Sequence, residues 1–166
     1  QSHEDVQFFL PRAHTIERSE LEAFISERKV PVTITEDHTY DLMQICDVCL
    51  AASGTATLET AMMELPTVLL YKVSPITYGI GKMVVNLTHV GLPNIVAGKE
   101  VIPELLQDDV SADAIVNTVL PLLDDLQVNQ HMRSELRNVK EKLGESGAVN
   151  RVAQLIYDLG KEKTNE

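Results

Sequence analysis

The chain has 166 residues, of which 44% are hydrophobic and 23% are charged, as is typical of a folded globular protein. Its formal net charge of −11 argues against a nucleic-acid surface, because binding of phosphate backbones requires clustered Lys and Arg. No apolar run approaches the roughly 20 residues of a transmembrane helix. The chain opens on QSHEDV without a methionine, and we interpret it as a piece of a longer protein. We expect one domain over 1–160 and a disordered tail over 161–166.

Short apolar runs alternate with amphipathic stretches in the first half of the chain. The runs favour β-strands at 6–10, 30–35, 47–51 and 66–72. The stretches favour helices at 17–28, at 40–45, from 56 onward and at 74–86. In the first of these helices, Leu21, Phe24 and Ile25 share the face that we expect to be buried. The alternation predicts a Rossmann-like α/β fold, with a parallel sheet covered by helices on both faces.

The second half is mainly helical in pattern. Helices are predicted at 111–123, 128–143 and 148–159. Residues 89–95 (HVGLPNI) read as a short extended segment that ends in a Pro-Asn turn. Cys46 and Cys49 form an isolated CxxC pair without the further ligands that a zinc site requires, so we interpret them as buried structural thiols in a reducing cytoplasm.

The stretch from Leu50 to Leu65 (LAASGTATLETAMMEL) predicts a strand, a turn of small residues and then a helix. Free backbone N–H groups and the positive end of the helix dipole meet at such a turn, which favours an anion such as phosphate. Ser53 is a good N-cap, Gly54 allows close approach of a ligand and Thr55 adds a hydroxyl. Similar turns occur in α/β proteins that bind nothing there, so an empty turn is the alternative.

Positive charge collects in one part of this acidic chain. Residues 65–99 contain no Asp or Glu but include Lys72, Lys82, His89 and Lys99. This positive segment could accept an anionic ligand or an anionic membrane surface, although three lysines over such a span can also arise by chance. Ligands of parallel α/β sheets bind at the carboxyl ends of the strands, where we expect the Ser53 turn, Lys72 and the turn at 36–39 to meet.

Three motifs, in the same order, resemble lipid-A-disaccharide synthase. They are ASGTATLE at 52–59, YKVSP at 71–75 and LPNIVAGKEVIPELLQ at 92–107. That family has the GT-B glycosyltransferase architecture, and the resemblance covers only its C-terminal half. It implies a UDP-sugar-binding domain of Rossmann type, whose N-terminal acceptor domain lies outside this chain.

The resemblance also implies roles for particular residues. The backbone N–H groups of Ser53, Gly54 and Thr55 would hold the diphosphate of the donor, and Glu59 would accept hydrogen bonds from the ribose hydroxyls. Asn94 would lie close to the donor, and Lys72 would join the UDP-sugar site. Glu104 and Gln107 match the family as well, and support of the fold alone would explain them. Uracil would meet backbone groups around 36–39.

The implied reaction is inverting glycosyl transfer in lipid A biosynthesis. The donor would be UDP-2,3-diacylglucosamine, and the acceptor 2,3-diacylglucosamine 1-phosphate. The resemblance implies no metal, because GT-B enzymes of this kind need none. It implies no cofactor either, because the UDP-sugar is a substrate. No catalytic residue is expected in this chain, since the general base belongs to the N-terminal half of the enzyme. The implied location is the cytoplasmic side of the inner membrane in a Gram-negative-type bacterium, with peripheral attachment; a homodimer stays open.

Two alternatives remain from the sequence. The chain could belong to another GT-B enzyme that uses UDP-N-acetylglucosamine, such as a MurG-like transferase or a 2-epimerase. It could also be a non-catalytic α/β scaffolding domain whose Ser53 turn is empty. Competition by acylated and unacylated donors distinguishes the first alternative, and protection of the backbone amides by UDP distinguishes the second.

Overall fold

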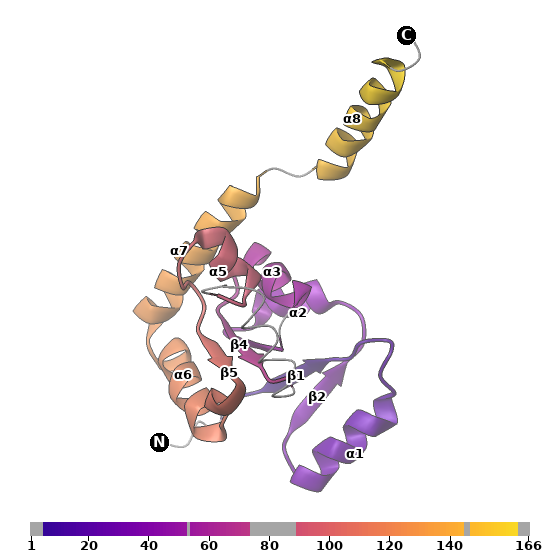
Figure 1. Ribbon diagram of the computed structural model, residues 1–166. Coiled ribbons are helices and arrows are strands. Elements are labelled where there is room, and N and C mark those ends of the chain that lie inside the picture. The colour runs from indigo at the N-terminus through magenta and orange to yellow at the C-terminus, as the bar shows by residue number, and fades with distance from the viewer. Residues whose placement is uncertain (1–4, 53, 74–88, 145–146, 163–166) are drawn as a thin grey trace. The chain divides into compact units, whose positions relative to one another are not determined.

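The computed structural model describes residues 5–52, 54–73, 89–144 and 147–162. Its contacts divide the chain into two compact units, Gln1–Cys46 and Asp47–Glu166. Both units are α/β, and each strand pairing among the described residues is parallel (Figure 1). The predicted fold class, parallel sheets flanked by helices in a Rossmann-like manner, is confirmed. The extent of the domain over 1–160 stays a prediction.

The first unit is a βαβα segment. Its elements are β1 (Phe8–Pro11), α1 (Arg18–Arg28), β2 (Val32–Thr35) and α2 (Thr39–Ile45). The two strands pair with Phe8 opposite Val32, so both carboxyl ends lie at one edge. The prediction that Phe24 is buried is wrong: its side chain is 59% exposed, and the Arg28 guanidinium stacks over its ring at 3.8 Å. A cation held over an aromatic face explains how this ring is accommodated at the surface.

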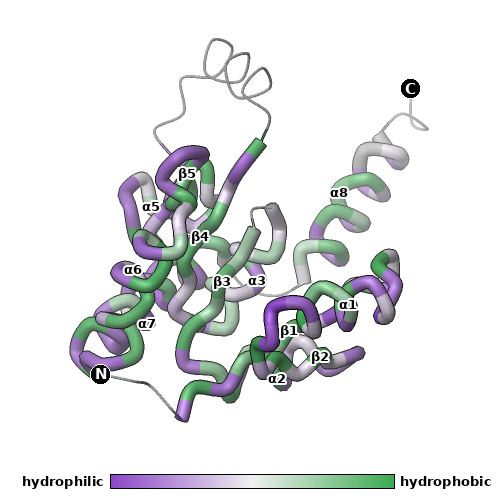
Figure 2. Tube along the Cα trace, turned by 90° about the horizontal axis from the view of Figure 1, so that it is seen from below, coloured by the Kyte–Doolittle hydropathy of each residue, from purple (hydrophilic) through white to green (hydrophobic). Residues whose placement is uncertain are grey.

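The second unit is built on a three-stranded sheet. The strands are β3 (Cys49–Ala51), β4 (Thr67–Tyr71) and β5 (Glu104–Leu106), in the order β3-β4-β5. The central strand is the most buried, and its residues Val68 and Leu69 are fully buried. Figure 2 shows the hydrophobic residues that run along β3 and β4. Burial of this kind is expected for a parallel strand with a neighbour on each side.

The helices of this unit supply the rest of its core, apart from the last one, whose described residues are exposed. They are α3 (Thr55–Met62), α5 (Leu92–Ala97), α6 (Ala112–Asp124), α7 (Leu126–Leu143) and α8 (Ala148–Glu162), with a short 3₁₀ helix η1 (Gln107–Asp109). In α7, Met132, Leu136 and Val139 recur at helical spacing and are buried, on the helix that contacts α3 and α5. The predicted start of α6 is confirmed, since the Ser111 hydroxyl accepts a hydrogen bond from Ala114 N at 3.2 Å.

Three predictions about this unit have other outcomes. The predicted extended segment at 89–95 is wrong, because Leu92–Ala97 is helix α5. Gly91 precedes this helix and Pro93 lies in its first turn, where the fixed φ of proline favours a helix start. Strand β5 was not predicted. Helix α8 extends through 161–162, the first two residues of the predicted disordered tail. The helix predicted at 74–86 lies outside the described residues.

Candidate functional site

The carboxyl edge of the β3-β4-β5 sheet gathers three of the six predicted binding residues. Ala51 is opposite Leu69, and Tyr71 is opposite Leu106, so the three strands end side by side. The segments that follow them carry Gly54, Thr55, Lys72 and Gln107. This is the edge at which open α/β sheets bind ligands.

The turn between β3 and α3 is open at Gly54. This residue has φ 83° and ψ −158°, a conformation that is essentially limited to glycine. A Cβ atom at Gly54 would meet no other atom within 4 Å, so nothing in the described structure fills the space beside it. Ser53 was predicted as the N-cap, but α3 begins at Thr55 with Gly54 as the N-cap; Ser53 itself lies outside the described residues.

The start of α3 leaves N–H groups available for an anion. The N-cap residue Gly54 has no side chain that could cap this helix, and the N–H groups in the first turn of an α-helix have no acceptor in a preceding turn. Thr57 stabilises the turn from behind: its hydroxyl donates to Gly54 O at 2.9 Å, and its own N–H reaches the same oxygen at 3.3 Å. Thr55 is exposed at the mouth of the turn, and Glu59 lies one helical turn further along, partly buried. This role of Thr57 was not predicted from the sequence, although threonine hydroxyls in the first turn of a helix often bond to the backbone of the preceding turn.

The lysines of the positive segment separate into different places. Lys72 follows β4 at the carboxyl edge and is exposed. Lys99 precedes β5, at the opposite end of that strand, and forms an ion pair with Glu135 of α7. Lys82 lies outside the described residues. Of the two lysines of this segment that the structure describes, Lys72 is the one at the candidate site.

Asn94 is fully buried, and its side-chain amide is fully used by the protein. Its Nδ2 donates to Ile102 O at 2.9 Å and to Glu104 Oε1 at 2.7 Å. Its Oδ1 accepts from Val101 N at 2.7 Å and Ile102 N at 2.9 Å. Two donated and two accepted bonds exhaust what an amide group can make. In this structure Asn94 joins α5 to the strand that precedes the candidate site.

Glu104 accepts hydrogen bonds from two further N–H groups and so completes this arrangement. Its carboxylate accepts from Val90 N at 2.9 Å and from Gly91 N at 2.9 Å, besides the amide of Asn94. A Cβ atom at Gly91 would lie 3.1 Å from Glu104 Oε1, so this close approach depends on glycine. Glu104 thereby supports the fold, which is one of the roles expected for it from the sequence.

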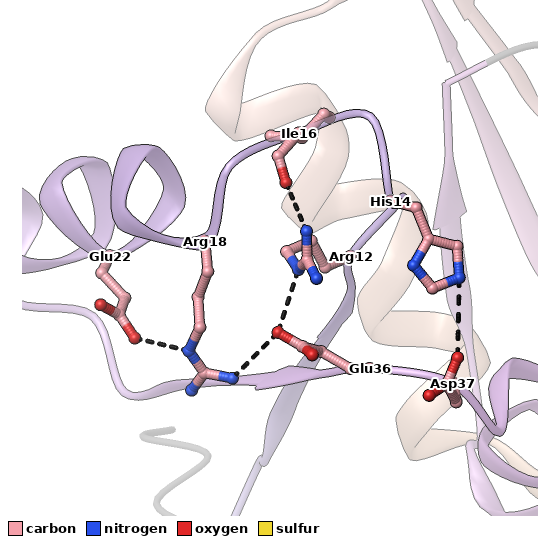
Figure 3. A network of polar contacts seen from close by, with 7 residues as sticks. All are labelled: Arg12, His14, Ile16, Arg18, Glu22, Glu36 and Asp37. Carbon is pink, nitrogen blue, oxygen red and sulfur yellow. Dashed lines mark hydrogen bonds and ion pairs between the residues drawn. The ribbon is translucent and has the colours of Figure 1, made fainter.

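The first unit has its own polar cluster at the carboxyl ends of β1 and β2 (Figure 3). The guanidinium of Arg12 donates to Glu36 Oε1 at 3.0 Å and to Ile16 O at 2.7 Å. The hydrogen bond from Arg12, with a smaller contribution from Arg18, lowers the pKa of the Glu36 carboxyl. Asp37 and His38 follow with φ values of 59° and 53°, so the turn at 36–39 has a defined, left-handed backbone. Its predicted contact with uracil stays a prediction.

Within residues 5–52, 54–73, 89–144 and 147–162, no three His, Cys, Asp or Glu side chains are gathered as metal ligands. Within the same ranges, no helix combines the length and the apolar character needed to cross a bilayer. Both thiols, Cys46 and Cys49, are reduced and partly buried.

Comparison with known proteins identifies the family. The family model for lipid-A-disaccharide synthetase matches residues 1–156. The chain is 44% identical over 163 residues to the lipid-A-disaccharide synthase of Geobacter sulfurreducens, covering 98% of this chain and 42% of the relative. For the synthase of Persephonella marina, identity is 39% over 164 residues, covering 96% and 43%. The chain thus spans about two fifths of these curated relatives. It belongs to the lipid-A-disaccharide synthase family.

Proposed function

We propose that this chain is the donor-binding half of a glycosyltransferase of lipid A biosynthesis. The enzyme transfers 2,3-diacylglucosamine from UDP-2,3-diacylglucosamine to 2,3-diacylglucosamine 1-phosphate, and UDP leaves. The observation that carries the proposal is the open turn at Gly54, the N-cap residue of helix α3, in a chain of this family. Such a turn presents several N–H groups to the two phosphates of the donor.

The proposed roles follow from position. The N–H groups of Ser53, Gly54 and Thr55 hold the diphosphate, and the ammonium of Lys72 at the same edge offsets its charge. Glu59 lies one helical turn beyond Thr55 in α3. Its carboxylate would repel a phosphate but is suited to accept hydrogen bonds from ribose hydroxyls. Asn94 acts on the donor side of the site through the packing of α5, because its own amide is already fully hydrogen-bonded.

The proposed chemistry is inverting and independent of metal. Negative charge develops on the departing diphosphate, so N–H groups and a cation aimed at it stabilise the transition state more than the ground state. A general base must take the proton of the attacking acceptor hydroxyl. We assign that base to the N-terminal half, so that this chain alone binds UDP but does not transfer sugar. Sugar transfer by the purified 166-residue chain would overturn that assignment.

The proposed partners follow from the chemistry of the substrates. Both sugars carry acyl chains, so the complete enzyme works at the cytoplasmic surface of the inner membrane, together with its N-terminal half.

A calorimetric titration with UDP tests the proposal. The wild-type chain should bind UDP, and replacement of Glu59 by Ala should weaken binding by about 1.5–3 kcal/mol, as expected for loss of a hydrogen bond donated to a charged acceptor. The matched control is Glu141→Ala, an exposed carboxylate on α7. No binding by the wild-type chain, with no protection of the amides at 54–57 from hydrogen exchange, would favour a scaffolding domain instead. Unchanged affinity in Glu59→Ala would remove only Glu59 from the site.

A further inference from the structure

Pairing between β4 and β5 continues beyond the end of β5 through a side chain. Hydrogen bonds in a parallel ladder recur every second residue, and Leu69 N donates to Pro103 O at 2.9 Å. Two such steps further along, Val73 N lies opposite Gln107. The main-chain oxygen of Gln107 accepts from the N–H of Val110, the residue that follows η1. Its side-chain Oε1 accepts from Val73 N instead, at 3.0 Å. The amide side chain therefore replaces the main-chain acceptor of the ladder.

Gln107 makes this bond from an unusual backbone conformation. Its φ is 52°, in the left-handed region that residues with a Cβ rarely adopt. The turn from β5 into η1 requires that conformation, and glycine would adopt it without strain. Glycine, however, has no side chain to accept the hydrogen bond from Val73. Strain of this kind at a ligand-binding edge is a reason to look for a function of the residue that carries it.

The hydrogen bond from Val73 N to Gln107 restrains the backbone next to Lys72. Tyr71, the residue before it, is paired with Leu106, and Val73, the residue after it, is held by Gln107. With both neighbours bonded to the same side, Lys72 stays in extended geometry, and its side chain projects on the face opposite to theirs. Without Gln107, the ladder ends at Tyr71, and the backbone of Lys72 has no such restraint beyond it.

We propose that Gln107 is a positioning residue of the donor site, which orients Lys72 toward the diphosphate through the N–H of Val73. This inference rests on the proposed function. An amide suits the task because it accepts a hydrogen bond without adding negative charge beside an anionic ligand. A carboxylate in the same place would hold Val73 equally well but would repel the diphosphate.

The test combines UDP titration with hydrogen exchange of the Val73 amide in the 166-residue chain. In Gln107→Ala we expect Val73 exchange to be about 10-fold faster, and UDP affinity about 3- to 10-fold weaker, as for loss of one oriented interaction. In Gln107→Glu we expect Val73 to stay protected while UDP affinity falls. Val139→Ala, a core change in α7, controls for general destabilisation and should leave UDP affinity unchanged.

A double variant tests whether Gln107 acts through Lys72. Combining Lys72→Ala with Gln107→Ala should weaken UDP binding no more than Lys72→Ala alone, because the two residues supply one interaction. Additive losses, or unchanged affinity in Gln107→Ala, would overturn the positioning role while leaving the proposed function in place. A wild-type chain that fails to bind UDP would overturn the proposed function, and this inference with it.

Discussion

Replacement of Asn94 by Asp should destabilise the second unit, although the two side chains have nearly the same shape. Asn94 is fully buried, and its Nδ2 donates to Ile102 O and to Glu104 Oε1. Aspartate has an oxygen at both positions of the amide. The bonds from Val101 N and Ile102 N can therefore remain, but the oxygen that replaces Nδ2 faces Ile102 O and Glu104 Oε1.

The magnitude follows from the contacts that are lost. Two donated hydrogen bonds disappear. Ile102 O loses the donor Nδ2, which costs roughly 1–3 kcal/mol for a buried acceptor, whereas Glu104 Oε1 keeps its bond from Gly91 N. The new carboxylate of residue 94 also faces Glu104, where the present separation between donor and acceptor is 2.7 Å. We therefore expect Asn94→Asp to lower the free energy of unfolding by about 3–5 kcal/mol at pH 7, a large share of the stability of an ordinary domain.

The pH dependence gives this prediction a definite sign. Two carboxylates in contact share a proton, so the pKa of the pair is raised above its unfolded value of about 4. At this pair the folded variant then binds more protons than the unfolded chain, so the contribution of the pair to stability is most favourable at low pH and becomes less favourable as pH rises. The difference from wild type should therefore be smaller at pH 5 than at pH 7.

Urea denaturation at the two pH values measures this difference. Asn117→Asp, on the exposed surface of α6, is the matched control and should change stability by less than about 0.5 kcal/mol. Should Asn94→Asp be too unstable to study, the double variant with Glu104→Gln removes the charge repulsion and should recover part of the loss. A loss below about 1 kcal/mol at pH 7, or a loss that is independent of pH, would refute the assigned hydrogen bonds.

The remaining predictions concern other contacts of the second unit. Gly91→Ala should cost about 1–3 kcal/mol by thermal denaturation, because the new methyl group would lie 3.1 Å from Glu104 Oε1. Gly160→Ala, which meets nothing within 4 Å in α8, should be neutral or slightly stabilising; equal effects of the two substitutions would contradict the close approach at Gly91. Glu64→Gln should cost about 1 kcal/mol at pH 7, because the hydrogen bonds from Arg137, and then Lys140, lower the pKa of the Glu64 carboxyl. That stabilisation is present above the unfolded pKa and is lost as pH falls through the folded value, so wild type and variant should converge near pH 3 in acid titrations; a gap that persists there would refute it.

The sequence by itself determined the features that depend on neighbouring residues. Alternating strands and helices predicted the parallel α/β class, and Ser111 predicted the start of α6 through a bond that spans three residues. The small residues before α3 predicted an open turn, and Gly54 has the conformation that only glycine adopts readily. These elements follow from local propensity, capping and turn chemistry, which a single stretch of sequence contains.

The tertiary structure alone decided the features that join distant residues. Strand β5 has three residues, and its identity as a strand comes from pairing with β4 rather than from its own pattern. Asn94 read as part of a turn, yet it is buried because Ile102 and Glu104 complete its hydrogen bonds. Gln107 bonds to Val73, 34 residues away, across strands that only folding brings together. Contacts of this kind depend on the register between strands, which no local pattern specifies, and they surround the edge where the ligand is proposed to bind.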